Sequence, residues 1–275
     1  MNQTVNYLRF DCKNFSISHC TVPHAQEDSF PMHTHVVPEL LYIEEITGCH
    51  VVEDKEYQLS GGDLIIVPPA TYHSIRLQPG STYKRYNICF SPEILANIDT
   101  RKIYQNIKVI NCTGNSVISG IFRKFDYYAD ILEEEQFIDM TQMLIREIFY
   151  NLSVYDGTLD IDPSFLSPML SQAIDYINKH LYDIESVTEI SSSLFITDSY
   201  LYEIFKNQLK TSPKKYINSK RLHAARREII LGARPSDACN TVGFHDYAAF
   251  YRSYNRFFGH SPSQEKNFGW SYEKY

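Results

Sequence analysis

The chain has 275 residues, of which 43% are hydrophobic, and its formal net charge is −7; this length allows two domains with separate cores. The longest strongly apolar run, residues 64–67, is far too short to cross a bilayer, and the amino terminus lacks the basic-then-apolar order of a signal peptide. Because the six cysteines are scattered without a Cys-x-x-Cys pair, as suits a reducing cytosol, we exclude a membrane protein and expect a soluble, cytoplasmic one.

The acidic charge is concentrated in the front part of the chain. Residues 168–275 carry 14 Lys and Arg against 11 Asp and Glu, a net charge of +3, which leaves 12 against 22, a net charge of −10, for residues 1–167. An acidic chain argues weakly against binding to nucleic acid, but the field that matters is that of the part touching the phosphates. The asymmetry removes that objection. Since +3 is modest, affinity should depend on groove fit and dimerisation as well as on counterion release.

Short β-prone runs follow one another in the front third of the chain. They cover residues 40–46, 50–52, 56–59, 64–67 and 83–90. The pairs and triplets that separate them are Thr47-Gly48, Asp54-Lys55, Ser60-Gly61-Gly62 and Pro68-Pro69. This is the turn chemistry of an antiparallel barrel, which we predict over residues 1–110.

Two helical patterns come next. Residues 116–128 and 133–150 each carry an apolar stripe at three- and four-residue spacing. The stripes consist of Ile118, Ile121, Phe122 and Phe125 in the first pattern, and of Phe137, Met140, Leu144 and Ile148 in the second. Packing in the core is the simpler interpretation of the first stripe. We therefore predict a helical segment over residues 111–152, and turn-forming residues such as Asp156-Gly157 and Asp162-Pro163 predict a linker over 153–167.

The rear part carries two helix, turn, helix patterns in tandem, at residues 187–206 and 236–254. Apolar residues recur at helical spacing in the second helix of each pattern, and these residues are Leu201, Ile204, Phe205, Phe250 and Tyr254. Thr197 and Asp246 stand where they can cap those helices. Two similar units so close together indicate a duplicated structural element.

One long helix is predicted between the two patterns, over residues 213–231. Ser212 can serve as its N-cap, Pro213 suits its first turn, and Gly232 stands where a helix commonly stops. Such a helix would span roughly 28 Å at ~1.5 Å per residue, while successive major-groove faces of B-DNA lie roughly 34 Å apart. A rigid rod of that size could hold two recognition helices on one side of a duplex.

Family-specific residues run through the rear part from Ile174 to Ser263. They are Tyr200-Leu201, Ile204-Phe205-Lys206, Arg221-Leu222, Ala225, Val242-Gly243-Phe244-His245-Asp246, Phe250, Arg252, Phe258-Gly259 and Ser261-Pro262. On these residues, positions 168–268 resemble the DNA-binding domain of AraC/XylS-type transcription regulators. The resemblance implies an all-α domain whose two recognition helices enter adjacent major grooves of a double-stranded DNA operator.

Several positions depart from the pattern of these regulators. Phe195 stands where the first turn usually has glycine, and Ser191 and Cys239 replace the small alanine of each leading helix. Asn255 replaces a common lysine, and Glu265-Lys266 stands where an aromatic-arginine ending is usual. These departures bear on the shape of the first turn and on phosphate contacts.

The resemblance places candidate base-reading side chains on both recognition helices. They are Ser199, Tyr202 and Glu203 on the first, and Tyr247, Ala248, Tyr251 and Arg252 on the second. Serine can bond to several bases, glutamate accepts from cytosine, arginine favours guanine, and alanine and aromatic rings offer apolar contact to thymine methyls. Lysines are better placed as phosphate partners, which position the protein without reading sequence; the candidates are Lys206, Lys210, Lys214, Lys215 and Lys220. The alternatives are packing for Tyr247 and Tyr251, and a solvated face for any single lysine.

A second set of motifs lies in the front third, over about residues 10–90. It consists of His33-Thr34-His35, Glu39, Gly62-Asp63-Leu64, Pro68-Pro69 and His73. These motifs resemble the cupin-type sensor domain that precedes the DNA-binding domain in many such regulators. By that resemblance His33, His35, Glu39 and His73 match the four metal positions of catalytic cupins, and the first two histidines, two apart on a strand, would share a face.

Two interpretations of these four side chains stay open. Three imidazoles and a carboxylate could hold Zn, Fe or Mn. We favour the alternative that they line a polar pocket and hydrogen-bond a small-molecule effector with no metal or other cofactor, because fold alone does not specify function. Tyr42, with Tyr72 and Tyr86, could add ring faces and hydroxyls for a sugar-like or aromatic effector.

The sequence thus favours a ligand-responsive transcription regulator and not an enzyme. An effector would enter the barrel, change how barrel, helices and DNA-binding domain are disposed, and shift which DNA sites are occupied. The resemblance suggests that residues 133–150 pair two copies into a homodimer. The main alternative is a metal-dependent cupin enzyme fused to a DNA-binding domain, and a third is a regulator that senses a protein partner.

Overall fold

The computed structural model describes residues 4–104, 108–154, 164–165, 167–230 and 232–265. The chain divides after Ser164 into two compact units. The first is an antiparallel β fold with added helices and the second is all-α, so the predicted fold class is confirmed. Most of the predicted linker, residues 153–167, lies outside the described residues. Among the described residues, no helix combines the length and the apolar character needed to cross a membrane.

Two antiparallel sheets form the first unit. Their strands are β1 (Val5–Asp11), β2 (Phe15–Val22), β3 (Phe30–His33), β4 (Glu39–Glu45), β5 (Gly48–Val52), β6 (Lys55–Leu59), β7 (Asp63–Val67), β8 (His73–Leu77), β9 (Tyr83–Phe90), β10 (Lys108–Asn111) and β11 (Ser164–Phe165). The six-stranded sheet has the order β1-β2-β9-β4-β7-β10, and the five-stranded sheet has the order β11-β6-β5-β8-β3. The predicted strands are β4, β5, β6, β7 and β9. The other strands were not predicted because polar residues interrupt their apolar pattern; β8, for example, begins His73-Ser74.

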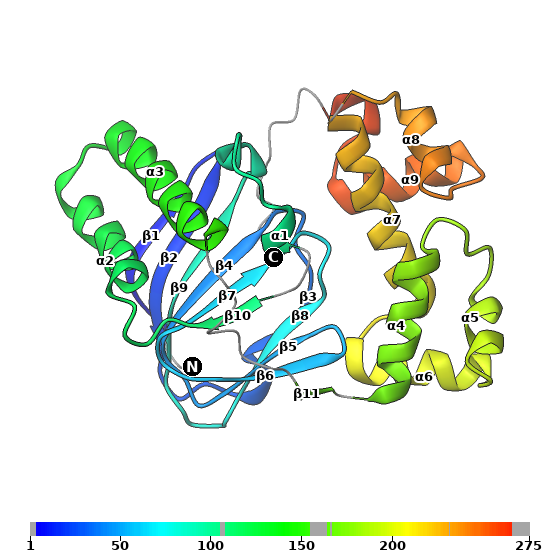
Figure 1. Ribbon diagram of the computed structural model, residues 1–275, viewed down its shortest axis with the longest axis horizontal. Coiled ribbons are helices and arrows are strands. Elements are labelled where there is room, and N and C mark those ends of the chain that lie inside the picture. Colours follow the sequence, from blue (N-terminus) through cyan, green and yellow to red (C-terminus); the bar gives the residue numbers. More distant parts are fainter. Residues whose placement is uncertain (1–3, 105–107, 155–163, 166, 231, 266–275) are drawn as a thin grey trace. The chain divides into compact units, whose positions relative to one another are not determined.

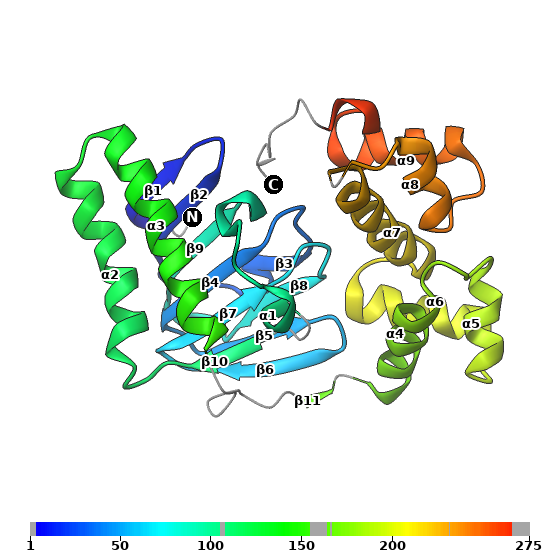
Figure 2. The ribbon, with the colours of Figure 1, turned by 45° about the horizontal axis from the view of Figure 1, so that its top comes forward.

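The six-stranded sheet is buried on both faces, and β4 shows how. Leu40 and Tyr42 point into a core beneath two helices, whereas Leu41 and Ile43 point into a second core shared with the other sheet. The helices are α2 (Ser116–Ile131) and α3 (Glu134–Ser153), and Figures 1 and 2 show them lying side by side over the sheet. The two helices predicted in this region are therefore confirmed. Shorter elements are η1 (Glu27–Ser29), η2 (Pro92–Leu95) and α1 (Arg101–Tyr104).

Polar contacts also join α2 to the sheet. His19 on β2 lies with Nδ1 2.9 Å from Asp126 Oδ2 on α2 and with Nε2 2.8 Å from Glu44 Oε2 on β4. Its ring stacks on Tyr86 with a centroid distance of 3.9 Å. Both ring nitrogens thus face carboxylates, an arrangement that the protonated imidazole satisfies best.

Seven helices form the second unit as the structure describes it. They are α4 (Pro168–His180), α5 (Val187–Ser193), α6 (Asp198–Leu209), α7 (Pro213–Ile230), α8 (Pro235–Thr241), α9 (Tyr247–Phe258) and the short η3 (Pro262–Gln264). The 18 residues of α7 span about 27 Å, as predicted, and Gly232 follows with a φ of +108°. Helices α4 to α6 surround one half of α7 and α8 and α9 the other half (Figure 1).

Arg221, near the middle of α7, ties the two halves together. The side chain is 7% exposed, and its guanidinium donates to the carbonyl oxygens of Leu181 and Ile184, both at 2.7 Å, and of Gly243 at 3.0 Å. The first two carbonyls precede α5, and the third lies in the turn between α8 and α9. One buried cation therefore fixes both duplicated elements to the connecting helix.

Candidate functional site

The recognition helices, α6 and α9, begin at side-chain caps. Thr197 Oγ1 accepts from the N–H of Tyr200 at 3.2 Å, and Asp246 Oδ1 accepts from the N–H of Ala248 at 2.8 Å. Both predicted caps are confirmed. The buried side chains are Leu201, Ile204, Phe205 and Leu209 on α6, and Phe250, Tyr254 and Phe258 on α9. The opposite side of each helix remains open to solvent.

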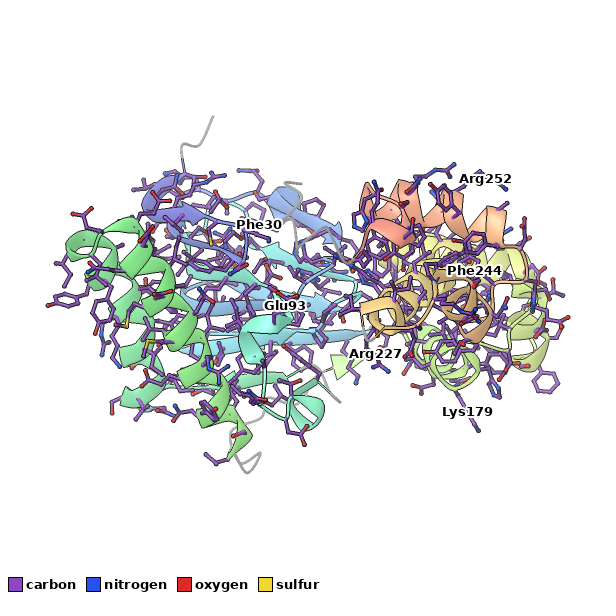
Figure 3. All side chains as sticks on the ribbon, turned by 90° about the horizontal axis from the view of Figure 1, so that it is seen from above. Phe30, Glu93, Lys179, Arg227, Phe244 and Arg252 are labelled. Atoms are coloured by element: carbon purple, nitrogen blue, oxygen red, sulfur yellow. The ribbon has the colours of Figure 1, made fainter. Side chains whose placement is uncertain are left out.

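All eight side chains that the sequence assigns to a DNA surface are exposed. They are Ser199, Tyr202, Glu203 and Lys206 on α6, and Tyr247, Ala248, Tyr251 and Arg252 on α9. Tyr247 and Tyr251 are 44% and 39% exposed, so neither ring is a core residue. Figure 3 shows Arg252 projecting from the second unit. The four residues on α6 and the four on α9 thus each lie on one helix. That they contact DNA bases remains a prediction.

Four of the five candidate phosphate partners are exposed as well, namely Lys206, Lys210, Lys214 and Lys215. Lys220 is only partly exposed, and its Nζ donates to Asn178 Oδ1 of α4 at 3.2 Å. Lys220 is therefore less available to a phosphate than its position in the sequence suggests.

The turns of the two duplicated elements have the same backbone hydrogen bonds. In the first turn the N–H groups of Phe195 and Ile196 donate to Ser192 O and Ser191 O at 3.2 and 3.0 Å, and in the second those of Gly243 and Phe244 donate to Asn240 O and Cys239 O at 3.2 and 3.1 Å. Phe195 and Gly243 occupy the same place in the turn. Both have positive φ, +56° and +80° respectively. The duplication seen in the sequence is thus repeated in the backbone.

The left-handed conformation has a different cost at these two positions, because only one residue has a Cβ. Phe195 adopts it with a side chain that is 96% exposed. A Cβ at Gly243, in contrast, would lie 2.3 Å from the carbonyl oxygen of Tyr182. The departure at Phe195 therefore adds strain to the first turn without changing its shape.

Two of the other departures, Ser191 and Glu265, supply bonds inside the second unit. The Ser191 hydroxyl bonds to Asp198, the first residue of α6, which also accepts from Thr188 Oγ1 at 2.8 Å. Glu265 is 4% exposed; it accepts from Arg226 Nε at 2.7 Å and from the hydroxyl of Tyr254. This ion pair could not be predicted from the sequence, because its members are far apart along the chain.

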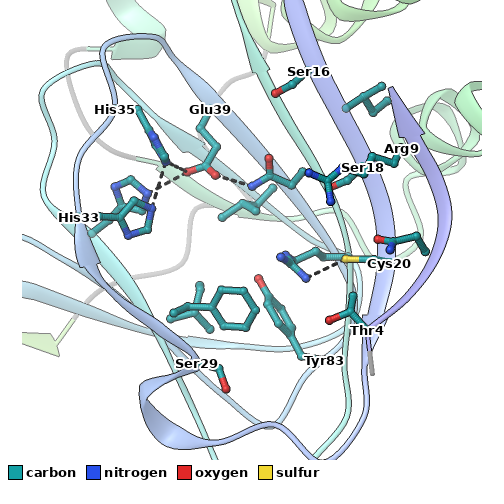
Figure 4. A pocket seen from close by; sticks show the side chains of 18 of the residues that line it. Thr4, Arg9, Ser16, Ser18, Cys20, Ser29, His33, His35, Glu39 and Tyr83 are labelled. Carbon is teal, nitrogen blue, oxygen red and sulfur yellow. Dashed lines mark hydrogen bonds and ion pairs between the residues drawn. The ribbon is translucent and has the colours of Figure 1, made fainter. Parts of the chain in front are cut away.

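An open cavity of about 490 Å³ lies in the first unit. Its walls come from β1, β2, β4 and β9 of one sheet and from β3 and β8 of the other. Figure 4 shows the polar side chains that point into it, with His33, His35 and Glu39 at one side and Tyr83 and Cys20 at another. The cavity thus combines ionisable groups with aromatic surface.

Four of the five residues assigned to an effector meet in this cavity. His33 Nε2 lies 3.1 Å from His35 Nε2, and Glu39 Oε2 lies 2.9 Å from His73 Nε2 and 3.6 Å from His35 Nε2. The expectation that one strand carries His33 and His35 is wrong, because β3 ends at His33. The rings converge because His33 is the register partner of His73 in the β3–β8 pair, while His35 lies in the segment leading into β4.

Burial sets the charge states of this group. It lowers the pKa of His35 to about 4 and that of His33 below its usual value, so both rings are neutral at pH 7. Burial opposes ionisation of Glu39, but the imidazoles of His35 and His73 more than offset it and lower the pKa of Glu39. Asn87 Nδ2 also donates to Glu39 Oε1. The group is a carboxylate among imidazoles.

Tyr42 does not line the cavity, so its assignment to an effector is wrong. Side chains one position apart on a strand point to opposite faces, and Tyr42 points to α2, where its ring stacks on Phe122 with a centroid distance of 4.4 Å. Tyr86, opposite Tyr42 on β9, faces the same way and donates to Asp126. Both tyrosines therefore belong to the contact between sheet and helices.

The sequence analysis missed the polar side chains of β9 that do face the cavity: Tyr83, Arg85 and Asn87. The guanidinium carbon of Arg85 lies 4.6 Å from the ring centroids of both Phe30 and Tyr83. The signal was the alternation of these residues with Tyr86 and Ile88 along residues 83–90. Among the described residues, two groups have metal-ligand geometry: His33, His35 and His73, and His35, Glu39 and Cys89.

Comparisons with known proteins match both units. A family model described as a helix-turn-helix domain matches residues 190–267, and one described as an AraC-like ligand binding domain matches residues 18–124. The chain is 35% identical over 289 aligned positions to the Msm operon regulatory protein of Streptococcus mutans, covering 96% of this chain and 97% of that one. It is also 22% identical to the lactose operon transcription activator of Staphylococcus xylosus, covering 78% and 77%, and 23% identical to the raffinose operon transcriptional regulatory protein RafR of Pediococcus pentosaceus, covering 81% and 82%.

Proposed function

The chain belongs to the AraC family of transcription regulators, and we propose that it regulates transcription in response to a saccharide that binds in the cavity of its first unit. Two of its relatives are named for the operons of sugars, lactose and raffinose. The observation that carries the proposal is a cavity lined by both polar and aromatic groups, most of which lie in the part of the chain that matches the ligand-binding model.

The lining of this cavity suits a ligand rich in hydroxyl groups. Such a ligand needs acceptors, donors and a flat apolar surface, and Glu39, Asn87 and the partly exposed ring of Phe30 offer one of each. Arg85 adds a cation held against two aromatic rings. A volume of about 490 Å³ lies in the usual range for small-molecule sites.

On the DNA side, we assign base reading to the exposed faces of α6 and α9. Arg252 pairs with guanine and Glu203 accepts from cytosine, while Tyr247 and Tyr251 contact thymine methyls. The exposed lysines near the end of α6 and the start of α7 neutralise phosphates. The two helix-turn-helix elements have the same kind of N-cap and the same backbone hydrogen bonds in the turn. This similarity supports a pair of recognition helices that approach DNA in the same way.

A homodimer through α3 is part of the proposal. Met143 and Tyr150 are 61% and 50% exposed; their spacing of seven residues places them on one side of the helix. The same helix buries Leu144 and Ile148 against the sheet. An isologous pairing of two copies would cover the exposed stripe.

One observation favours a second candidate, a metal-dependent enzyme fused to a DNA-binding domain: the group of three imidazoles and Glu39. The relatives are regulators of transcription, and we propose that this chain is not an enzyme. Turnover that requires a stoichiometric metal and is lost with His35→Ala would favour the enzyme. A regulator that senses a protein partner is the third candidate, and stabilisation of the chain by a sugar argues against it.

The test combines DNA selection with ligand binding. Purified chain should select fragments with a common sequence from a random pool, and one saccharide of a panel should change the selected set and raise the melting temperature. Arg85→Met should abolish the thermal shift, whereas Tyr42→Phe, the matched control on the opposite face, should keep it. The proposal fails if no saccharide changes either measurement, or if Tyr42→Phe and Arg85→Met behave alike.

A further inference from the structure

We propose that Glu265 is a positioning residue for DNA reading: it fixes the second recognition helix, α9, at the rotation that presents Arg252 to the bases. The inference rests on the proposed function, because it takes α9 to read DNA, and it adds a buried residue that acts through others. Glu265 follows η3, where its N–H donates to Pro262 O at 3.4 Å. Its side chain is 1% exposed.

One buried carboxylate joins three elements. Glu265 Oε1 accepts from Arg226 Nε of α7 at 2.7 Å, and Oε2 accepts from the hydroxyl of Tyr254 of α9. His260, between α9 and η3, has its Nε2 3.4 Å from Oε2. Each of these four residues is at most 6% exposed. Because a buried charge is costly unless it is paired and hydrogen-bonded, the carboxylate is confined to the point where these partners meet.

The hydroxyl of Tyr254 defines the rotation of α9. Its ring is fully buried and packs against Phe250 and Phe258 with centroid distances of 5.5 and 4.5 Å. Apolar packing is non-directional, whereas a hydrogen bond to a carboxylate weakens steeply when its angle changes. Since successive residues of an α-helix are about 100° apart, Arg252 and Tyr254 point about 200° apart, to nearly opposite sides of α9. Fixing Tyr254 against the carboxylate therefore fixes the direction of Arg252.

Arg226 ties this contact to the long helix. Its guanidinium carbon lies 4.8 Å from the ring centroid of Phe258, so the cation contacts α9 as well as Glu265. The same helix, α7, holds both duplicated elements through Arg221. Glu265 thus sets α9 relative to the helix to which the first duplicated element is also fixed.

Small rotations of α9 are enough to affect base reading. Side chains reach about 5–6 Å from the axis of a helix, so a rotation of about 10° moves their ends by about 1 Å. A binding group works within about 0.5 Å and 10–20° of its best geometry, and the bidentate pairing of arginine with guanine depends on such geometry. Helix α6 has a different anchor, since its Asp198 bonds to Ser191 and Thr188 of α5. The effect of Glu265 should therefore be confined to the bases that α9 reads.

The fold does not require a carboxylate at this place. Glu265 stands where regulators of this family usually have an aromatic residue. Replacing a buried ion pair by apolar residues is often neutral or stabilising. Stability alone therefore does not account for the arrangement, whereas the choice of one helix rotation does.

The experiment measures the affinity of the full chain for its selected operator and for copies with single base substitutions. Arg252→Ala marks the positions read by α9, and Glu203→Ala marks those read by α6. Tyr254→Phe removes only the hydroxyl that binds Glu265, and it should lower discrimination at the α9 positions by about fivefold or more while keeping it at the α6 positions. Glu265→Gln should do the same. Tyr176→Phe on α4, outside this cluster, is the matched control and should change neither.

A purely structural role predicts a different result. Lower stability reduces the affinity for every sequence alike, so unchanged discrimination at the α9 positions in Tyr254→Phe and Glu265→Gln would overturn the inference. An operator with no base position that depends on Arg252 would overturn it as well. Because both changes break one bond, the double variant should lose no more discrimination than either single variant, and additive losses would contradict the role of that bond.

Hydrogen exchange in the absence of DNA separates the two proposals. In Tyr254→Phe the amides of α9 should exchange at least several-fold faster, while those of α6 keep their rates. Unchanged exchange in α9 would overturn the inference even in a chain that selects no DNA sequence. Faster exchange in α9 of a chain that selects none would refute the proposed function and leave the role of Glu265 in fixing α9 in place.

Discussion

Phe195→Gly should stabilise the second unit, which is unusual for the loss of a large side chain. The left-handed conformation costs a residue with a Cβ roughly 1–2 kcal/mol, and Phe195 has a φ of +56°. Because its side chain is 96% exposed, almost no buried area is lost. Glycine returns about 0.5–1 kcal/mol of this gain through its freedom in the unfolded chain. The net expectation is a stabilisation of about 0.5–1 kcal/mol.

Urea unfolding followed by far-ultraviolet circular dichroism measures the effect. With a slope of about 2 kcal/mol per molar urea, the midpoint of the transition of the helical unit should rise by about 0.3–0.5 M. Gly243→Ala is the matched control at the equivalent place in the second turn, and it should lower the midpoint, because its Cβ would meet the carbonyl oxygen of Tyr182. A lower midpoint for Phe195→Gly would refute the argument from strain and would indicate that the phenyl ring makes a stabilising contact.

Arg252→Ala should weaken DNA binding by about 1–3 kcal/mol at particular base positions, whereas Lys215→Ala should weaken all sequences alike and reduce the salt slope by about one unit; equal losses on random and cognate DNA for Arg252→Ala would contradict base reading. Burial lowers the pKa of His19, but its hydrogen bonds to two carboxylates more than offset this and raise it above 6.5. The stability contributed by His19 should therefore be complete below pH 6.5 and be lost as the pH rises through the higher folded pKa; melting temperatures across this range check it, and a His19→Gln chain with the same pH dependence would disprove it. Arg226→Met should cost about 3–5 kcal/mol in urea unfolding, because Glu265 is left buried without its cation, and a loss under about 1 kcal/mol would show that the pair is not buried in solution.

The helices of the second unit could be predicted because their signals are local. Thr197 and Asp246 mark where α6 and α9 begin, Gly232 marks where α7 has stopped, and apolar residues recur at helical spacing between such marks. A cap acts on its own helix within one turn, so one sequence is enough to find it. The backbone strain at Phe195 was harder to predict from the sequence. The turn that requires its positive φ is defined by hydrogen bonds to residues of the preceding helix.

The cavity was harder to foresee. Strand β4 reads Leu40-Leu41-Tyr42-Ile43 because it is buried on both faces, so no alternation of polar and apolar residues reveals which face holds the cavity. Tyr42 was assigned to the wrong face for this reason. The partners of His33 and Glu39 come from other strands, and only the pairing of β3 with β8 and of β4 with β9 brings His73 and Asn87 to them.

The distribution of bound and free basic groups explains how an acidic chain can meet DNA. Two arginines of the second unit are occupied internally, Arg221 by three carbonyls and Arg226 by Glu265. Arg234 is exposed, but it is paired with Asp237 of the same helix end. The exposed lysines gather where α6 ends and α7 begins, at Lys206, Lys210, Lys214 and Lys215. Attraction to phosphates should therefore be strongest beside the first recognition helix. The second, which presents Tyr247, Tyr251 and Arg252, should depend more on groove contacts, so the two halves of one duplicated element contribute unequally to salt dependence and to sequence choice.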